Sequence, residues 1–283
     1  MQIMKREIRG GSALLTAYIQ DKSEAIHASE ARPAVLIFPG GGYEFVSDPE
    51  GEPVALAYAA KGFQTFVLKY SVKDKGVFPA PQREAFEAIA VIRRNAAEFM
   101  VDPDKIAVVG FSAGGHLAAS TGVFWNDAEV NDSKSPEECR PNALVLVYPC
   151  ITLDAYPGIR EVHGRGLKNL EKLSLEKYVG KHTPPSFICH TATDTCVSPL
   201  DSLLFAEALT KAGVPYELRI YKDGPHGMSL ATKAVSSPYL LTFDESVQRA
   251  VHAAGARFSE WFDKSAEFLR LVFDGGSVEK LLG

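Results

Sequence analysis

The segment Gly110–Gly114 is the part of the chain whose residue types and spacing most clearly suggest chemistry. It reads Gly-Phe-Ser-Ala-Gly, with the apolar run 106–109 before it and a stretch of small residues after it. A serine flanked by glycines at a strand-to-helix junction is typical of a sharp turn that raises the hydroxyl above the sheet, at the positive end of a helix. Ser112 is therefore a candidate nucleophile. A plain tight turn is the alternative, because glycine pairs also form such turns.

A serine hydroxyl needs a base to remove its proton, and the base needs a carboxylate to orient it. In an open α/β sheet these partners lie in loops after the carboxyl ends of later strands. Asp194 follows the expected strand 186–189, and His226 follows the expected strand 216–221. The chain thus offers serine, acid and histidine in an order that known triads use.

Each of these partners has a plainer interpretation. Asp194 could cap a turn or a helix, and His226 could be an exposed loop residue among the seven histidines. Asp201 and Asp223 are alternative acids, but Asp201 falls within an expected helix and Asp223 lies in the histidine's own loop. Because three independent placements agree with one geometry, we predict a triad of Ser112, Asp194 and His226.

Acyl transfer also needs backbone N–H groups that bind the oxygen anion of the intermediate. Ala113, the residue after the candidate nucleophile, is the expected source of one donor. The glycine-rich loop 40–42 follows an early strand and is the expected source of the others. A phosphate-binding loop or a simple turn is the alternative. A dinucleotide-binding loop would need a further glycine opening a helix, and Tyr43 to Val46 stand there instead.

The strands that would position these residues can be recognised from apolar runs. Continuous apolar runs indicate parallel strands buried on both faces, and they occupy 33–38, 65–68, 106–109, 143–147 and 186–189. The segment 216–221 alternates, which favours a strand nearer an edge, and 12–20 could open the sheet as an antiparallel strand.

Helical patterns lie between the strands. They cover 52–61, 81–100, 198–211 and 245–273, the last as one long amphipathic helix or two. This alternation predicts an α/β fold with a mainly parallel sheet. The segment 154–185 breaks the alternation and is rich in glycine, which predicts a cap or a functional loop, with a plain surface connection as the alternative.

The composition excludes several classes of protein. The 283 residues are 46% hydrophobic and 23% charged, which is enough for a substantial core. A net charge of −5 disfavours nucleic acid, and no apolar run is long enough to span a membrane. The four cysteines have neither zinc-site nor redox-pair spacing. We therefore expect no metal site. Because the start of the chain lacks the apolar core of a signal peptide, we expect a cytoplasmic protein. No motif indicates whether it forms a homo-oligomer.

Together these motifs resemble the α/β-hydrolase superfamily, in its esterase/lipase branch. More narrowly, the chain resembles bacterial acetyl-xylan esterase-like, xylanase-associated carbohydrate esterases. The segments that carry the resemblance are 39–43, 67–72, 110–118, 194–197 and 224–227. The resemblance implies a three-layer sandwich with helices on both faces of a mostly parallel sheet of about eight strands. It also implies a single domain over 1–283, with a small cap at 154–185.

The same resemblance implies roles for the candidate residues. Ser112 would be the nucleophile, His226 the base and Asp194 its orienting acid. The oxyanion donors would be the backbone N–H groups of Gly41, Gly42 and Ala113.

The chain departs from some relatives at two positions. Pro39 stands where the hormone-sensitive-lipase group has histidine, which favours the carbohydrate-esterase branch. Thr193 precedes Asp194 where many relatives carry two adjacent acids, but Val197 follows at the usual spacing. His116, one turn into the helix after the serine, is expected to be structural.

The expected function is that of a serine carboxylesterase without a cofactor. The resemblance implies a small-molecule ester substrate with a short acyl group such as acetyl, carried on an acetylated sugar or xylo-oligosaccharide. An amidase or formamidase and a serine peptidase are rival enzymes on the same fold. A non-catalytic binding protein is the rival of another class. The loops 154–185 and 228–243 would decide between substrates.

Overall fold

A single eight-stranded sheet forms the centre of the computed structural model, which describes residues 1–25, 31–153, 170–236 and 244–275. The strand order is β1-β2-β4-β3-β5-β6-β7-β8, and within it only β2 runs opposite to its neighbours. The strands are β1 (Gln2–Ile8), β2 (Ala13–Ile19), β3 (Arg32–Phe38), β4 (Gln64–Lys69), β5 (Val101–Phe111), β6 (Ala143–Val147), β7 (Ser186–Thr191) and β8 (Tyr216–Tyr221).

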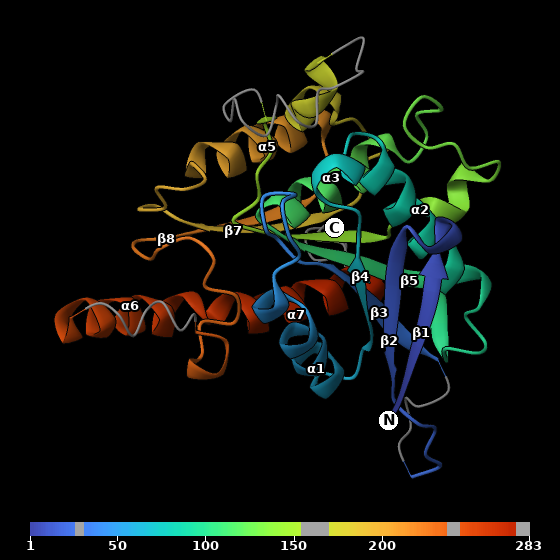
Figure 1. Cartoon of the computed structure of the whole chain (residues 1–283), viewed down its shortest axis with the longest axis horizontal. Helices are drawn as coiled ribbons and strands as arrows, with labels where there is room; N and C mark the ends of the chain where they lie inside the picture. Colours follow the sequence, from blue (N-terminus) through green and yellow to red (C-terminus); the bar gives the residue numbers. More distant parts are fainter. Residues whose placement is uncertain (26–30, 154–169, 237–243, 276–283) are drawn as a thin grey trace, which may run out of the picture.

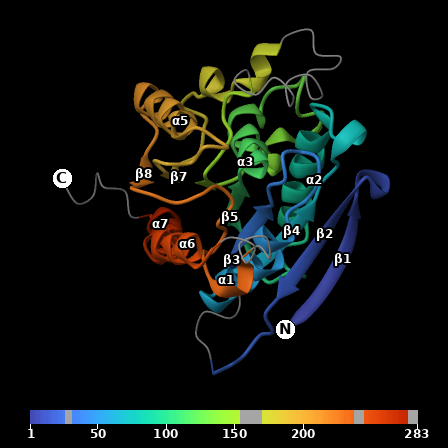
Figure 2. The same ribbon diagram turned by 60° about the vertical axis from the view of Figure 1, so that its left-hand side comes forward.

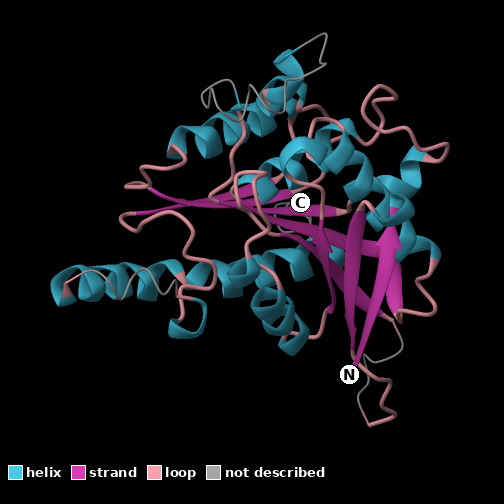
Figure 3. Cartoon of the chain, in the orientation of Figure 1, coloured by secondary structure: helices cyan, strands magenta, loops and turns pink. Residues whose placement is uncertain are grey.

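Helices cover both faces of this sheet, so that the molecule has three layers (Figures 1 and 3). On one face lie α2 (Ala80–Arg94), α3 (Ala113–Phe124) and α5 (Pro199–Ala212). On the other lie α1 (Glu52–Ala60) and α7 (Glu260–Phe273), preceded by α6 (Glu245–Phe258). The turned view in Figure 2 shows α6 and α7 on the opposite side of the sheet from α3 and α5. The predicted α/β architecture and the antiparallel strand near the N-terminus are confirmed.

Two hydrophobic clusters, one on each face, explain why the strands read as continuous apolar runs. Neighbouring residues of one strand go to opposite clusters: Leu36 packs with the α2 and α3 layer, while Val35 packs with α1 and α7. Because both faces are covered, neither set of alternate positions can be polar. The predicted edge strand β8 has no such run, since its side chains are only partly buried.

Two elements differ from the sequence expectation, and for a third the structure shows one of the two arrangements expected. The helix expected over 81–100 ends at Arg94, because Asn95 leaves the helical conformation with φ −105° and ψ 26°, and its side chain donates to the carbonyl of Val91. The segment 245–273 forms two helices that meet at Ser259. Strand β1 was not predicted, because it is an edge strand whose charged residues are mostly exposed.

Half of the predicted cap, residues 154–169, lies outside the described residues. The described remainder contains two short 3₁₀ helices, Leu170–Leu173 and Leu175–Tyr178. Leu173 and Leu175 are buried in the core, and the N–H of Leu175 donates to the carbonyl of Ile151. Within the described parts of the chain, no helix is long and apolar enough to cross a membrane.

Candidate active site

Ser112 lies on the sharp turn between β5 and α3. Its backbone has φ 53° and ψ −119°, a conformation that strains a residue with a side chain. A Cβ on Gly110 would lie 2.1 Å from the carbonyl oxygen of Gly114, and a Cβ on Gly114 would lie 2.1 Å from that of Phe38. Because strand and helix pass so closely, the motif needs glycine at both positions.

The three residues predicted to form a triad are hydrogen-bonded to one another. Ser112 Oγ is 2.8 Å from His226 Nε2, and His226 Nδ1 is 2.7 Å from Asp194 Oδ2. They come from the loops at the carboxyl ends of β5, β7 and β8, where parallel strands bring such residues to one edge. A neutral imidazole that donates from Nδ1 to the carboxylate has its Nε2 lone pair free to accept the serine proton.

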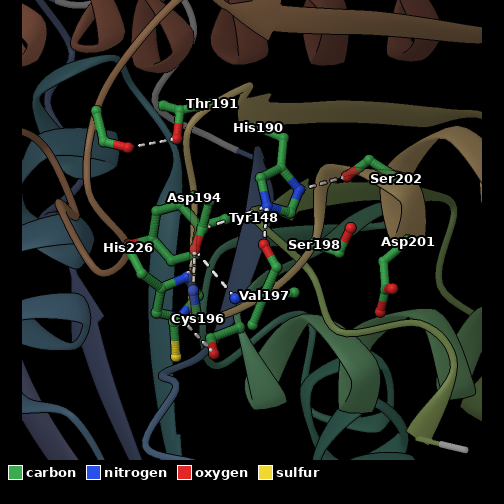
Figure 4. A network of polar contacts seen from close by, with 12 residues as sticks. Tyr148, His190, Thr191, Asp194, Cys196, Val197, Ser198, Asp201, Ser202 and His226 are labelled. Carbon is green, nitrogen blue, oxygen red and sulfur yellow. Dashed lines mark hydrogen bonds and ion pairs between the residues drawn. The ribbon is translucent and has the colours of Figure 1, made fainter. Parts of the chain in front are cut away.

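Asp194 is held by donors on both of its oxygens (Figure 4). Oδ1 accepts from the backbone N–H groups of Cys196, at 2.9 Å, and Val197, at 3.0 Å. Oδ2 accepts from His226 and also lies 3.3 Å from Nε2 of His190. Burial would raise the pKa of Asp194, but the hydrogen bonds from His190 and His226 outweigh it and hold that pKa well below its ordinary value. The carboxylate is therefore ionised and fixed in direction.

His190 is a residue that the sequence analysis missed. Its ring is fully buried, with Nδ1 2.8 Å from Ser202 Oγ and Nε2 3.0 Å from the carbonyl oxygen of Val197 (Figure 4). It supports Asp194 from the side away from His226. A histidine near the end of the apolar run before Asp194 was the available signal.

The two alternative acids and His116 have different partners. Asp201 accepts from the backbone N–H groups of Ile151 and Thr152, at 2.7 Å and 3.3 Å. Asp223 forms an ion pair with Arg257 at 3.8 Å. His116 is buried, with hydrogen bonds to the Tyr43 hydroxyl and to the carbonyl of Leu173, which fits the expected structural role.

The glycine-rich loop 40–42 lies against the serine. A Cβ on Gly40 would lie 3.1 Å from Cβ of Ser112. Gly41 and Gly42 both have positive φ, 124° and 63°, and the carbonyl of Gly41 accepts from the N–H of Glu44. Among the described residues, the N–H groups of Gly41, Gly42 and Ala113 have no acceptor. Three backbone donors next to one hydroxyl could bind an oxygen anion.

The two central glycines of this loop are expected to respond differently to alanine. In Gly41→Ala the new Cβ would lie 2.1 Å from the carbonyl oxygen of Phe45, so the loop must shift. We expect kcat to fall about 10²- to 10³-fold, as for loss of an oxyanion donor. Gly42→Ala meets no atom within 4 Å, and its φ of 63° lies in the left-handed helical region. It should cost about 1–2 kcal/mol of unfolding free energy and retain most activity. Steady-state kinetics and thermal unfolding measure both effects, and wild-type kcat in Gly41→Ala would exclude the loop from the reaction.

Glu50 and Tyr148 also contact this site, and nothing in the sequence singled them out. Glu50 is buried, and one oxygen, Oε2, accepts from the N–H of Gly40 at 2.8 Å. The other, Oε1, accepts from the Tyr148 hydroxyl at 2.7 Å. The Tyr148 ring lies 4.9 Å from the His226 ring, measured between centroids. Within the described parts of the chain, no three His, Cys, Asp or Glu residues are grouped as a metal site would need.

The covered sheet, the strained serine turn and the serine–histidine–aspartate chain at the strand ends define an α/β hydrolase. An α/β-hydrolase enzyme from a Medee basin deep-sea metagenome, MGS-M1, has a similar structure, with 38% identity and a TM-score of 0.73 over 97% of this chain and 98% of that one. The sequence matches the BD-FAE family over residues 22–209, and the chain belongs to that family.

Two further relatives are similar over most of the chain. Endo-1,4-beta-xylanase B of Butyrivibrio fibrisolvens is 34% identical over 209 residues, which are 71% of this chain but only 33% of the xylanase. The chain therefore spans about a third of the length of that curated relative. The acetyl ester-xyloside bifunctional hydrolase from Caldicellulosiruptor lactoaceticus is 35% identical, with a TM-score of 0.68 over 89% of this chain and 88% of that one.

Proposed function

We propose that the protein is a serine ester hydrolase that works through an acyl-enzyme. The observation that carries the proposal is the continuous hydrogen-bonded chain from Ser112 through His226 to Asp194. The serine end of these hydrogen bonds lies beside three backbone N–H groups that have no protein acceptor among the described residues. A nucleophile with its base, an oriented base and an oxyanion site are the parts that acyl transfer needs.

Each residue has one role in the proposed reaction. His226 Nε2 takes the hydroxyl proton as Ser112 Oγ attacks the ester carbonyl, and Asp194 stabilises the imidazolium that forms. The carbonyl oxygen becomes an anion and is bound by the N–H groups of Gly41, Gly42 and Ala113. When the intermediate collapses, the C–O bond to the alcohol breaks and His226 returns the proton to the leaving oxygen. Water then attacks the acyl-serine by the same steps and releases the acid.

The proposed substrates are short-chain esters, above all acetyl groups on sugars or xylo-oligosaccharides. The similarity to a xylanase and to an acetyl ester-xyloside hydrolase supports this choice. A pocket that fits an acetyl group excludes longer acyl chains by size, whereas an enzyme for lipids needs a wide apolar surface.

A substrate panel tests this proposal. The purified chain is offered acetylated xylo-oligosaccharides, p-nitrophenyl esters of increasing chain length, and N-formyl amides. We expect kcat/KM to fall at least about tenfold from acetyl to octanoyl esters, and acetate release from the oligosaccharide to exceed amide hydrolysis. A preference for octanoyl esters would contradict the carbohydrate-ester substrate. Faster cleavage of the formyl amide would instead identify an amidase.

A further inference from the structure

Glu50 is a buried carboxylate with no basic partner of the usual kind. Its side chain lies in the turn between the glycine loop and α1, and only 4% of the residue is exposed. Among the described residues it forms no ion pair with a lysine or an arginine. A carboxylate in such a place is unfavourable unless its oxygens are hydrogen-bonded and its charge has a use.

The two hydrogen-bond donors of Glu50 belong to two different parts of the site. The N–H of Gly40 precedes the proposed oxyanion donors, and its bond to Oε2 holds the start of the glycine loop. The hydroxyl of Tyr148, at the end of β6, donates to Oε1, and its ring lies edge-to-face with the His226 ring at an interplanar angle of 62°. Glu50 thus lies between the oxyanion loop and the histidine.

The loop that carries His226 is joined to the same group. The backbone N–H of Ser229 donates to the Tyr148 hydroxyl at 2.9 Å, and the Ser229 hydroxyl donates to the carbonyl of Pro49 at 2.7 Å. Tyr148 itself has φ 38°, which is unusual for a bulky side chain and is maintained only where surrounding contacts enforce it. These contacts fix the histidine loop against the turn that carries Glu50.

The titratable groups that face Glu50 come from three elements. They are Tyr148 after β6, Tyr70 after β4 and His226 after β8. Of these three, only the histidine can become positively charged. In acyl transfer that charge exists only while His226 holds the serine proton, so a fixed anion nearby stabilises the transition state more than the resting state.

We propose that Glu50 is a positioning residue for the esterase reaction, which with Tyr148 fixes the glycine loop relative to His226 and places a carboxylate near the imidazolium. This inference rests on the proposed function. The carboxylate of Glu50 accepts hydrogen bonds from Gly40 and Tyr148, and it acts through these two residues.

The unfavourable burial of the Glu50 carboxylate should appear in the pH dependence of the free energy of unfolding. Burial raises the pKa of Glu50 above its ordinary value of 4.5, and the bonds from Tyr148 and Gly40 only partly offset that. The native state therefore holds the proton more tightly than the unfolded chain, and the free energy of unfolding falls as pH rises above about 4.5 through the folded pKa. Glu50→Gln, which cannot ionise, removes this decrease.

The test compares Glu50→Gln with Glu52→Gln. Glu52 is exposed on α1, accepts from the Tyr18 hydroxyl at 2.9 Å, and provides the same chemical change away from the serine. For Glu50→Gln we expect kcat on p-nitrophenyl acetate to fall about 10- to 100-fold with KM within about threefold. We also expect the acid limb of the pH–rate profile to move to lower pH, because the imidazolium loses a neighbouring anion. The unfolding temperature at pH 8 should not fall. Glu52→Gln should retain wild-type kinetics.

A second variant separates the effect of the Glu50 charge from the effect of the hydrogen bond between Tyr148 and Glu50. Tyr148→Phe keeps the ring against His226 but loses the hydroxyl, so kcat should fall while the acid limb stays in place. A role in folding alone predicts a lower unfolding temperature and no shift of the acid limb in Glu50→Gln. That result, or wild-type kcat in Glu50→Gln, would overturn the inference.

The rate of Ser112 labelling by a fluorophosphonate separates this inference from the proposed function. The labelling reaction needs the serine, the histidine and the oxyanion donors, but not an ester substrate. If the wild-type chain is labelled yet hydrolyses no ester, the proposed function fails while slower labelling of Glu50→Gln still supports the inference. A wild-type chain that resists the probe contradicts both.

Discussion

Replacing Ser112 by alanine is expected to lower kcat for ester hydrolysis by about 10⁵-fold or more. The hydroxyl is the only group of the triad that can form the acyl-enzyme, and it donates to Nε2 of His226, whose Nδ1 in turn donates to Asp194. Without it, His226 has no side-chain nucleophile to deprotonate. Stopped assays with p-nitrophenyl acetate and with acetylated xylo-oligosaccharide measure the loss.

The loss in Ser112→Ala must be separated from damage to the fold. Ser120 lies in the same helix, α3, is fully buried, and donates to the carbonyl of His116 at 2.8 Å. Ser120→Ala therefore removes one buried hydroxyl from the same element and should retain kcat within about threefold. Ser112→Ala should also unfold near the wild-type temperature, because alanine keeps the Cβ on the strained backbone and removes only a half-buried hydroxyl. Equal hydrolysis by Ser112→Ala and the wild type would exclude the proposed mechanism.

Asp194→Asn is expected to lower kcat by about 10⁴-fold through the wrong histidine tautomer. Because the N–H groups of Cys196 and Val197 both point at Oδ1, the amide oxygen of asparagine must take that position. Its NH₂ group then faces His226 Nδ1, which has to accept rather than donate. The proton of the neutral ring moves to Nε2, where it blocks the uptake of the serine proton.

The matched control for this variant is Asp223→Asn. Asp223 is the alternative acid in the histidine's own loop, and its ion pair with Arg257 is exposed to solvent. Such a pair contributes little to stability, so we expect activity within about threefold of the wild type. The pH–rate profiles of both variants check the assignment. A large loss in Asp223→Asn together with a small loss in Asp194→Asn would show that the acid had been chosen wrongly.

The sequence was sufficient to place the three triad candidates because parallel strands impose a simple geometry. An apolar run predicts a strand, and parallel strands bring their carboxyl ends to one edge of the sheet. A polar residue just after each run, such as Asp194 after β7, therefore has a predictable position. Helix ends were less predictable, since α2 ends where Asn95 bonds back to Val91 rather than where its apolar period ends.

The supporting residues could not be found in the same way. Glu50 stands in a turn of polar and proline residues that reads as an exposed loop, and His190 lies within a strand that reads as core. Whether a glutamate in such a turn is solvated or buried depends on what packs over it, here Tyr148, which follows β6 and is far away in the sequence. No local pattern encodes that contact.

By itself the sequence determined the fold class and predicted the candidate nucleophile, base and acid that the structure brings together, because strand periodicity and the glycines of the serine turn are local properties. Only the tertiary structure decided how these groups are held. Hydrogen bonds from Tyr148 to Glu50, and from Ser229 to Tyr148, join segments that are distant in the chain. Such contacts form only when the sheet has assembled, since their geometry depends on the spacing of strands rather than on neighbouring residues.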